Sequence, residues 1–510
     1  MTKVVDYLIY DQILLTLHLL KISYIPVMYP RVEITKKILP DSSVVIIIKD
    51  DKLPEWLVLT KTEHAYAGRC MADNEELILI NSYYKLSLII QEKKFDETHR
   101  KYEELRRKAS RVREILKEHK KKEIVVASDH DMNSVLAFTD GLILSCYEFN
   151  KYRKEEGKSK HQMYPSEIYL FGNVKVNEVK WLNAVDKGVY FARDLVNEPN
   201  NYLNAVDFAA NVKQYAGNAG VQVEVYGRKK IEALRMGGIL SVNKGSIDPP
   251  TFSILEWNPS EPVNNKPVIL VGKGVMFDTG GINLKPTNYI EEMKADMAGG
   301  AVVAAVLSAI AEAGIKVHVI GLIPATDNRP GRDASVPGDI ITMYDGTKVE
   351  IINTDAEGRL ILADALSFAG NYNPALVISI ATLTGSAENA FGNQAIATMG
   401  NADREIFDLL AESGNTVYER LAEMPFFEEY GEMIKSEIAN LKNLGEKKAG
   451  AITAGKFLEN FTNYPFIHLD IAGCAISQKA EHYKPKGGTG TGVRLLAEFI
   501  RRLGTVQKKK

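Results

Sequence analysis

The feature that most constrains the fold is an alternation of apolar runs and helix-like segments in the second half of the chain. Apolar runs of strand length occupy residues 267–272, 316–323 and 375–382. Segments with the length and spacing of helices, 297–313 and 360–368, lie between these runs. Strands and helices that alternate in this way build a sheet with helices on both faces. We therefore predict an α/β fold.

A hairpin signal refines this fold class. Asp345 and Gly346 lie between two strand-like runs, 340–344 and 347–352, and an Asp-Gly pair favours a two-residue turn. An antiparallel hairpin within the alternation predicts a mixed sheet in place of a purely parallel one.

The chain has 510 residues, more than one ordinary hydrophobic core supports, so we expect more than one domain. Strand-like runs at 43–49 and 123–127 flank a helix-like stretch at 102–116, which indicates that a small α/β domain comes first. We predict an N-terminal α/β domain at 1–165 with a possible extension at 1–30, a linker region at 166–185, and a larger C-terminal domain at 186–510 that contains the mixed sheet.

Composition limits the partners and the compartment. The formal net charge of -2 and the pI near 6.6 give no net attraction to nucleic acid or to anionic membranes. The three cysteines form no CxxC pair, which disfavours a disulfide framework and fits the reducing cytoplasm. Any metal would therefore be bound by oxygen or nitrogen ligands.

The apolar segment 7–29 does not change these expectations. Asp11, His18 and Lys21 interrupt it, so it makes a poor membrane span. It also has neither the basic start nor the small-residue cleavage site of a signal peptide. We expect a cytoplasmic protein with no membrane partner.

Charged side chains collect where the predicted strands end. Lys273 follows the run 267–272, Asp278 lies in the glycine-bracketed loop after it, and Lys285 lies in the continuing loop. Asp296 precedes the next helix-like segment. Binding sites in α/β sheets form in the loops beyond the carboxyl ends of strands. These residues are therefore candidates for one shared site.

Two further acids, Asp355 and Glu357, end the second hairpin strand. In extended backbone, residues i and i+2 point to the same side, so both carboxylates can face one point while Gly358 lets the chain turn away. With Asp278 and Asp296 they would repel one another unless cations intervene. Two divalent metals about 3.5–4 Å apart would neutralise such a cluster. Taken singly, each acid would equally suit a helix cap, a turn or the surface.

Long, specific strings surround these residues. The strings are VGKGVMFDTGGINLKP, EEMKADM, NTDAEGRLILADAL, ARDLVNEP, IATLTG, HLDIAG and GGTGTGVRLL. Through them the chain resembles the leucyl aminopeptidase family of dinuclear metallopeptidases, the cytosol aminopeptidases, from about residue 180 to residue 500.

The resemblance implies a hydrolase that removes the N-terminal residue, with a Leu-like residue preferred, from peptides with a free N-terminus. By motif, Asp278 and Glu357 bridge two metals, and Asp355 completes one of the two metal sites. Lys273 and Asp296 complete the other metal site, which also binds the α-amine of the substrate. A lysine ligand must be a neutral amine, although the reference pKa is about 10.4, and adjacent cations favour that neutral form.

The resemblance also implies the catalytic groups. A water or hydroxide that bridges the metals attacks the scissile carbonyl, and protonated Lys285 stabilises the developing oxyanion. Arg359, together with backbone around Leu383, holds a bicarbonate ion that acts as general base. The pocket for the first side chain consists of Met293, Thr382, Thr384, Gly385, Ala472 and Ala475.

The resemblance further implies two metals per subunit, zinc or manganese with magnesium or cobalt possible, and a homohexamer. The string DNRPGRDAS at 327–335 departs from the usual family loop, which leaves efficiency and specificity open. The native metals, the exact residue preference and the physiological peptide also stay open.

Two other functions compete with this interpretation. Some bacterial members of the family bind DNA, but phosphate contacts need clustered Lys and Arg. The helix-like stretch at 100–122 carries mixed charge, which indicates a solvated helix face. A phosphoesterase would use a similar two-metal site. Lys273 as a ligand and the string NTDAEGRL favour the peptidase.

Overall fold

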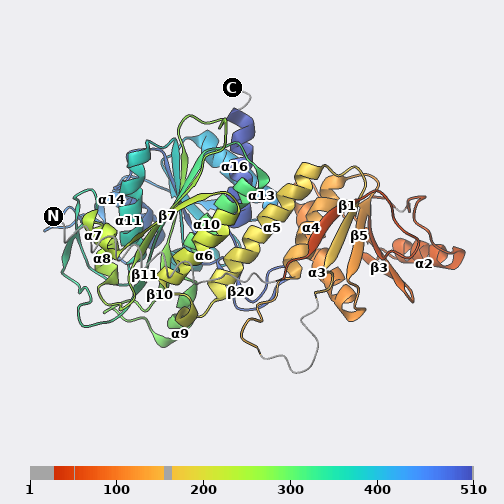
Figure 1. Ribbon diagram of the computed structural model, residues 1–510, viewed down its shortest axis with the longest axis horizontal. Coiled ribbons are helices and arrows are strands. Elements are labelled where there is room, and N and C mark those ends of the chain that lie inside the picture. Colours follow the sequence, from red (N-terminus) through yellow and green to blue (C-terminus); the bar gives the residue numbers. More distant parts are fainter. Residues whose placement is uncertain (1–27, 51, 154–162, 508–510) are drawn as a thin grey trace. The chain divides into compact units, whose positions relative to one another are not determined.

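The computed structural model describes residues 28–50, 52–153 and 163–507 (Figure 1). Almost all of the expected extension at 1–30, and the terminal lysines 508–510, lie outside the described residues. The chain forms two compact units. Among the described residues, the first unit contains 28–190 and the later segment Lys479–Lys486, and the second unit contains Phe191–Gln478 and the residues from Gly487 onward. The expected linker region, 166–185, contributes a strand and the beginning of a helix to the first unit.

The first unit is a small α/β domain around a six-stranded sheet of order β1-β6-β5-β2-β4-β3. All neighbouring pairs are parallel except β3 with β4. The strands are β1 (Arg31–Thr35), β2 (Val44–Ile48), β3 (Leu77–Ser82), β4 (Lys85–Gln91), β5 (Glu123–Ser128) and β6 (Glu167–Phe171). The helices are α2 (Lys61–Ala72), α3 (Thr98–Glu118) and α4 (Met132–Ser145).

Alternating side chains of β2 divide the core of this unit between two faces. Val45 and Ile47 pack with residues of α3 and α4, whereas Ile46 and Ile48 pack with residues of α2. The period of two along a strand explains the division. The small N-terminal α/β domain predicted from the sequence is confirmed.

The charged helix α3 is less solvated than its mixed charge predicts. Glu103, Arg106 and Lys108 are buried. Arg106 Nε lies 2.6 Å from Asp140 Oδ2, and Arg107 Nε lies 2.9 Å from Glu103 Oε1. Because its charges pair within the unit, α3 gives no support to the DNA-binding alternative.

The second unit is built on a nine-stranded mixed sheet. Eight strands follow the order β16-β15-β18-β14-β9-β11-β8-β7, and β10 pairs with β11 beside this path. The strands are β7 (Gln222–Gly227), β8 (Thr251–Trp257), β9 (Val268–Gly272), β10 (Gly274–Asp278), β11 (Val319–Asn328), β14 (Leu376–Ala381), β15 (Ile396–Gly400), β16 (Leu421–Glu423) and β18 (Phe466–Asp470).

Helices cover both faces of this sheet (Figure 1). The longer helices of the unit are α5 (Val176–Asn197, shared with the first unit), α6 (Ala205–Asn218), α10 (Ala298–Ala313), α11 (Gly358–Ala369), α13 (Arg404–Val417), α15 (Gly450–Glu459) and α16 (Val493–Gln507). The shorter helices are η1 (Asn200–Tyr202), α7 (Arg228–Ala233), α8 (Gly237–Asn243), α9 (Thr287–Ile290), η2 (Met293–Ala295), η3 (Gly370–Tyr372), α12 (Gly385–Phe391) and α14 (Glu429–Glu432).

The central strand β11 shows how the two layers form. Ile320 and Leu322 belong to the core that includes α8, α11 and α15. Gly321 lies on the other face, where a Cβ atom would meet Val303 of α10 at 2.8 Å. A glycine at this position therefore allows α10 to pack closely against the sheet. The predicted α/β class with a mixed sheet between helices is confirmed.

The reason predicted for the mixed sheet is wrong. The hairpin strands β12 (Ile340–Thr342) and β13 (Lys348–Glu350) form a separate three-stranded sheet with β17 (Leu441–Lys442). The large sheet is mixed because β7 with β8, β8 with β11, and β15 with β18 are antiparallel. A two-stranded sheet of β19 (Ile476–Ser477) and β20 (Gly487–Gly488) completes the strands.

The turn of the hairpin also differs from the two-residue prediction. The Met343 N–H donates to Thr347 O at 2.9 Å, so three residues form the turn. Gly346 has φ +93°, the left-handed conformation that three-residue hairpin loops require.

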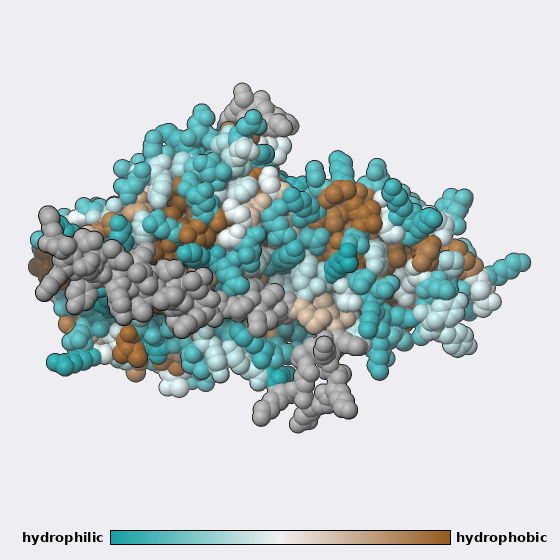
Figure 2. Space-filling view, in the orientation of Figure 1, coloured by the Kyte–Doolittle hydropathy of each residue, from teal (hydrophilic) through white to brown (hydrophobic). Residues whose placement is uncertain are grey.

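One described segment, 287–313, is long and apolar enough to cross a membrane by length and composition alone. Within its most apolar 18-residue stretch, 94% is buried inside the protein, which is typical of a core helix. On the face that Figure 2 shows, hydrophilic residues predominate and hydrophobic residues gather in separate patches.

We predict that Asp364→Ala lowers the free energy of unfolding by about 3 kcal/mol, because it leaves buried backbone donors without an acceptor. The fully buried Asp364 accepts the N–H groups of Ile239 and Tyr344, each at 2.9 Å, and also that of Gly238. Denaturant unfolding would measure the loss. Asp408→Ala, at an exposed carboxylate of α13, should stay within about 0.5 kcal/mol of the parent. An unchanged midpoint for Asp364→Ala would contradict the prediction.

Candidate metal centre

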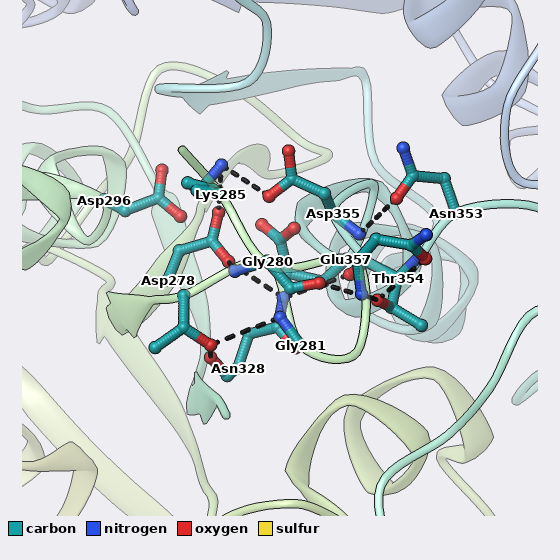
Figure 3. Close-up of polar contacts among 12 residues, drawn as sticks. Asp278, Gly280, Gly281, Lys285, Asp296, Asn328, Asn353, Thr354, Asp355 and Glu357 are labelled. Atoms are coloured by element: carbon teal, nitrogen blue, oxygen red, sulfur yellow. Dashed lines mark hydrogen bonds and ion pairs between the residues drawn. The ribbon is translucent and has the colours of Figure 1, made fainter. Parts of the chain in front are cut away.

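The sheet topology brings the predicted metal ligands to one edge. Lys273 joins the end of β9 to β10, and Asp278 ends β10 opposite Asn328 of β11. The stretch 274–278, expected as a loop, is therefore a strand. Asp296 directly follows η2 near the start of α10. Figure 3 shows the carboxylates of Asp278, Asp355 and Glu357 converging beside Lys285.

The cluster contains the carboxylates of Asp278, Asp355 and Glu357 and the ammonium groups of two lysines that pair with them. The fourth carboxylate, that of Asp296, pairs with Lys273. One oxygen each of Asp278, Asp355 and Glu357 lies within 4.8 Å of the others. Lys285 Nζ lies 2.8 Å from Asp278 Oδ2 and 2.6 Å from Asp355 Oδ1. Lys273 Nζ lies 2.7 Å from Asp296 Oδ2 and 2.9 Å from Glu357 Oε1. The structure thus brings together all five predicted ligands and Lys285.

The route by which Asp355 and Glu357 converge differs from the sequence prediction. They are not in extended backbone: Asp355 lies in a turn, and Glu357 has φ -74° and ψ -36° at the start of α11. The next residue, Gly358, makes room for the Lys273 side chain instead of turning the chain, because a Cβ atom there would meet Lys273 Nζ at 2.6 Å. A side chain at position 358 would therefore displace Lys273.

The cluster is deeply buried and rich in carboxylates. Lys273, Asp278 and Glu357 are each 2% exposed. Burial raises the pKa of Asp278, and the neighbouring Glu357 carboxylate raises it further. Burial, together with Asp278 and Glu357, raises the pKa of Asp355 to about 6. Burial disfavours the Lys273 ammonium, but Asp296, Glu357 and Asp278 outweigh that effect and raise its pKa.

These residues fit a pair of divalent cations. Four carboxylates face only two ammonium groups, so negative charge is in excess. Within the part of the chain that the structure describes, the buried Glu357 Oε2 has no hydrogen-bond partner, and a buried carboxylate oxygen of this kind needs a cation or a donor. Oxygen ligands with one nitrogen suit zinc, manganese, magnesium or cobalt.

Five of the six residues expected around the first side chain of a substrate follow β14 or β18. Thr382 contacts two expected ligands: its hydroxyl donates to Asp296 Oδ1 at 2.8 Å, and its carbonyl accepts from Lys273 Nζ at 3.1 Å. Asp470 holds the two loops together. It accepts from the Leu383 N–H at 3.1 Å, the Thr384 hydroxyl at 2.7 Å and the Ala472 N–H at 3.2 Å. The other expected pocket residues are Met293 in η2, Gly385 at the start of α12 and Ala475 beyond β18.

Arg359 has an unsatisfied buried donor. The side chain is 4% exposed, and Nη1 donates to Asn443 O at 2.8 Å. Nε is buried and has no hydrogen-bond partner among the described residues, and burial lowers the pKa of Arg359 to about 10. This orphaned donor fits a small anion. The Leu383 N–H already donates to Asp470, so it does not offer itself to that anion.

Sequence reasoning missed Asn328 and Asp470 as site residues. Asn328 Nδ2 donates to Asp278 Oδ1 at 2.8 Å, and Asp470 positions the pocket loops. Both lie in strings that stood out in the sequence, DNRPGRDAS and HLDIAG. The end of a strand next to a predicted ligand was the signal that could have identified them.

Comparison with known proteins agrees with this geometry. The family described as the cytosol aminopeptidase family, catalytic domain, matches residues 190–497. A probable cytosol aminopeptidase of Chlorobium limicola is 44% identical over 379 residues, which cover 72% of this chain and 75% of the relative. One of Geobacter sulfurreducens is 42% identical over 372 residues, with 72% and 75% covered.

A solved structure shows the same fold. The bottromycin maturation enzyme BotP in complex with Mn has 27% sequence identity and a TM-score of 0.79, and the match covers 91% of this chain and 100% of that one. The matched family is dinuclear and metal-dependent, and the buried carboxylate cluster lies within the matched residues. This chain belongs to the cytosol aminopeptidase family of metal-dependent peptide hydrolases.

Proposed function

We propose that this protein removes the N-terminal residue, with a Leu-like residue preferred, from peptides with a free N-terminus. Lys273, Asp278, Asp296, Asp355 and Glu357 would hold two divalent metals. The observation that carries the proposal is the convergence of these side chains in a buried cluster with excess negative charge. When bound, the metal pair supplies Lewis acidity, which activates water and polarises the scissile carbonyl near neutral pH.

The protein groups have separate roles. Lys273 would act as a ligand only as a neutral amine, so its proton must leave as the cation binds. Lys285 keeps its charge: burial opposes the ammonium, but Asp278, Glu357 and Asp355 raise its pKa. The Lys285 side chain is 15% exposed, and its ammonium would stabilise the oxyanion of the tetrahedral intermediate.

Arg359 would hold bicarbonate as the general base. The support is its buried and unpartnered Nε, since a guanidinium offers a planar set of donors to a small oxyanion. Neighbouring backbone, and not the Leu383 N–H, would complete that site.

The residue preference would follow from the pocket residues, each of which is small or apolar. Methyl groups and a thioether suit a Leu- or Met-like side chain. The pocket would consist of Met293, Thr382, Thr384, Gly385, Ala472 and Ala475. Thr382 links this pocket to the metal centre through its bond to Asp296.

The remaining proposals concern metals, assembly and compartment. Zinc or manganese would occupy the centre, since both accept this ligand set and the solved relative BotP binds Mn. We propose a homohexamer, as implied by the family resemblance. A cytoplasmic location is in accord with the relatives named cytosol aminopeptidases and with the three free cysteines.

We predict that Asp355→Ala and Glu357→Ala each reduce the metal-dependent hydrolysis of leucinamide by more than about 100-fold, since outer partners of a metal already contribute 10–100-fold. Release of ammonia or leucine would measure the rate. Acetyl-leucinamide, whose amine is blocked, should not be cleaved by the parent. Glu405→Ala, at an exposed carboxylate of α13, should keep the parent rate. Full activity in both site variants would exclude the assignment.

We predict that chelation removes two divalent ions per chain and lowers the thermal midpoint. A ligand at 100 times its dissociation constant stabilises the folded state by about 2.7 kcal/mol. Elemental analysis would count the ions, and calorimetry before and after reloading with Zn or Mn would measure the shift. A chain that holds no divalent ion under any loading condition would refute the proposal.

We predict that Lys285→Met lowers kcat by about 10²–10³-fold while the metal content stays at the parent value, because a single oxyanion donor contributes that much. Steady-state kinetics with leucinamide and elemental analysis of the same samples would test this. Loss of metal together with activity would assign Lys285 to the assembly of the centre instead of to the reaction.

A further inference from the structure

Asn328 is the last residue of β11 and lies opposite Asp278 in the pairing of β10 with β11. It is 4% exposed. Its side-chain Nδ2 donates to Asp278 Oδ1 at 2.8 Å and to the carbonyl oxygen of Thr354 at 3.0 Å. An asparagine amide has two N–H donors, so both are used. Figure 3 shows Asn328 on the side of the cluster where Asp278, Gly280 and Gly281 lie.

The first of these bonds determines which oxygen of Asp278 is available. Oδ1 accepts from Asn328 Nδ2 and from the Gly280 N–H, each at 2.8 Å. Oδ2 is left to point at the cluster, where it lies 2.8 Å from Lys285 Nζ. Asp278 therefore presents one defined oxygen to a cation.

The second bond, from Asn328 Nδ2 to the Thr354 carbonyl, connects Asn328 to the segment that carries Asp355 and Glu357. Thr354 precedes Asp355, and its hydroxyl donates to Gly280 O at 2.6 Å and accepts from the Asn283 N–H at 2.9 Å. Asn328 and Thr354 thus join the loop after β10 to the turn before α11. Each of these segments contributes expected ligands.

The backbone of Asn328 and its surroundings hold the amide in one orientation. The carbonyl of Asn328 accepts from Thr279 N at 3.0 Å and Thr279 Oγ1 at 2.8 Å. Gly281, at φ +67°, lets the chain pass close to the side chain, since a Cβ atom there would meet Asn328 Oδ1 at 2.8 Å. An amide in fixed surroundings can set the geometry of its neighbours.

We propose that Asn328 is a positioning residue of the metal centre, which orients Asp278 and fixes its distance from the Asp355–Glu357 segment. This rests on the proposed function, in which Asp278, Asp355 and Glu357 bind the metals. An aspartate of the same size at position 328 would lose both donors and place a carboxylate against Asp278 Oδ1 and Thr354 O.

Asn264 offers a matched control in the same unit. It is also buried, at 6% exposure. Its Nδ2 donates to two carbonyls, Lys266 O at 2.9 Å and His318 O at 3.0 Å, and its Oδ1 accepts from the His318 N–H at 2.8 Å. Asn264→Asp therefore removes the same kind of bonds at a place that contains none of the expected ligands.

The test measures the metal affinity of the full-length Asn328→Asp, Asn328→Ala and Asn264→Asp proteins by chelator competition with Zn and Mn at one pH. Thermal unfolding of the chelated proteins would report stability separately. We expect Asn328→Asp to weaken metal binding 10–100-fold, Asn328→Ala to weaken it less, and Asn264→Asp to keep the parent affinity even where it loses stability.

Parent affinity in Asn328→Asp would overturn the proposal, and so would an equal loss of affinity in Asn264→Asp. If Asn328→Asp does not fold, the metal affinity of Asn328→Ala is compared with that of the parent and of Asn264→Asp instead. Parent affinity in Asn328→Ala would then overturn the proposal. A parent protein that binds no divalent ion would instead overturn the proposed function, and this inference with it.

Discussion

The structure depends on a balance of buried charge at one edge of its large sheet. Burying an ion costs several kcal/mol unless opposite charges and hydrogen bonds compensate. Here Lys273, at 2% exposure, pairs with Asp296 and Glu357, and Lys285 pairs with Asp278 and Asp355. The carboxylates still outnumber the lysines. A scaffold that holds them together so closely is suited to divalent cations, which supply the missing charge.

Packing elsewhere in the second unit holds that cluster in place. A small residue lets the backbone of α10 lie close to the backbone of β14. A Cβ atom on Gly299 would collide with the carbonyl of Ile380, so glycine is required where α10 meets β14. The Lys273 N–H donates to the same carbonyl at 3.2 Å. Packing of helix on sheet therefore directly sets the position of Lys273, an expected metal ligand. Asp470 does the same for the loops after β14 and β18, because one buried carboxylate accepts donors from both.

The places where sequence reasoning failed share a physical cause. An Asp-Gly turn specifies a hairpin locally, but it does not specify the sheet that the hairpin joins, and β12 and β13 pair with β17 instead of the large sheet. Spacing of two residues suggested that Asp355 and Glu357 converge in a strand, whereas a turn and the first residues of a helix bring them together. The mixed charges of α3 suggested solvent, but Glu103 and Arg106 are buried in ion pairs.

By itself the sequence determined the α/β class, the candidate ligands and the family, because these follow from local periodicity and from long strings of specific residues. Only the tertiary structure decided which carboxylate oxygen faces the cluster, why position 358 must be glycine, and that Asn328 connects two segments that carry expected ligands. Those features depend on distances between residues far apart in the chain, such as Lys273 and Gly358 or Asn328 and Asp278. Local sequence patterns carry no information about such distances until the sheet and its helices are packed.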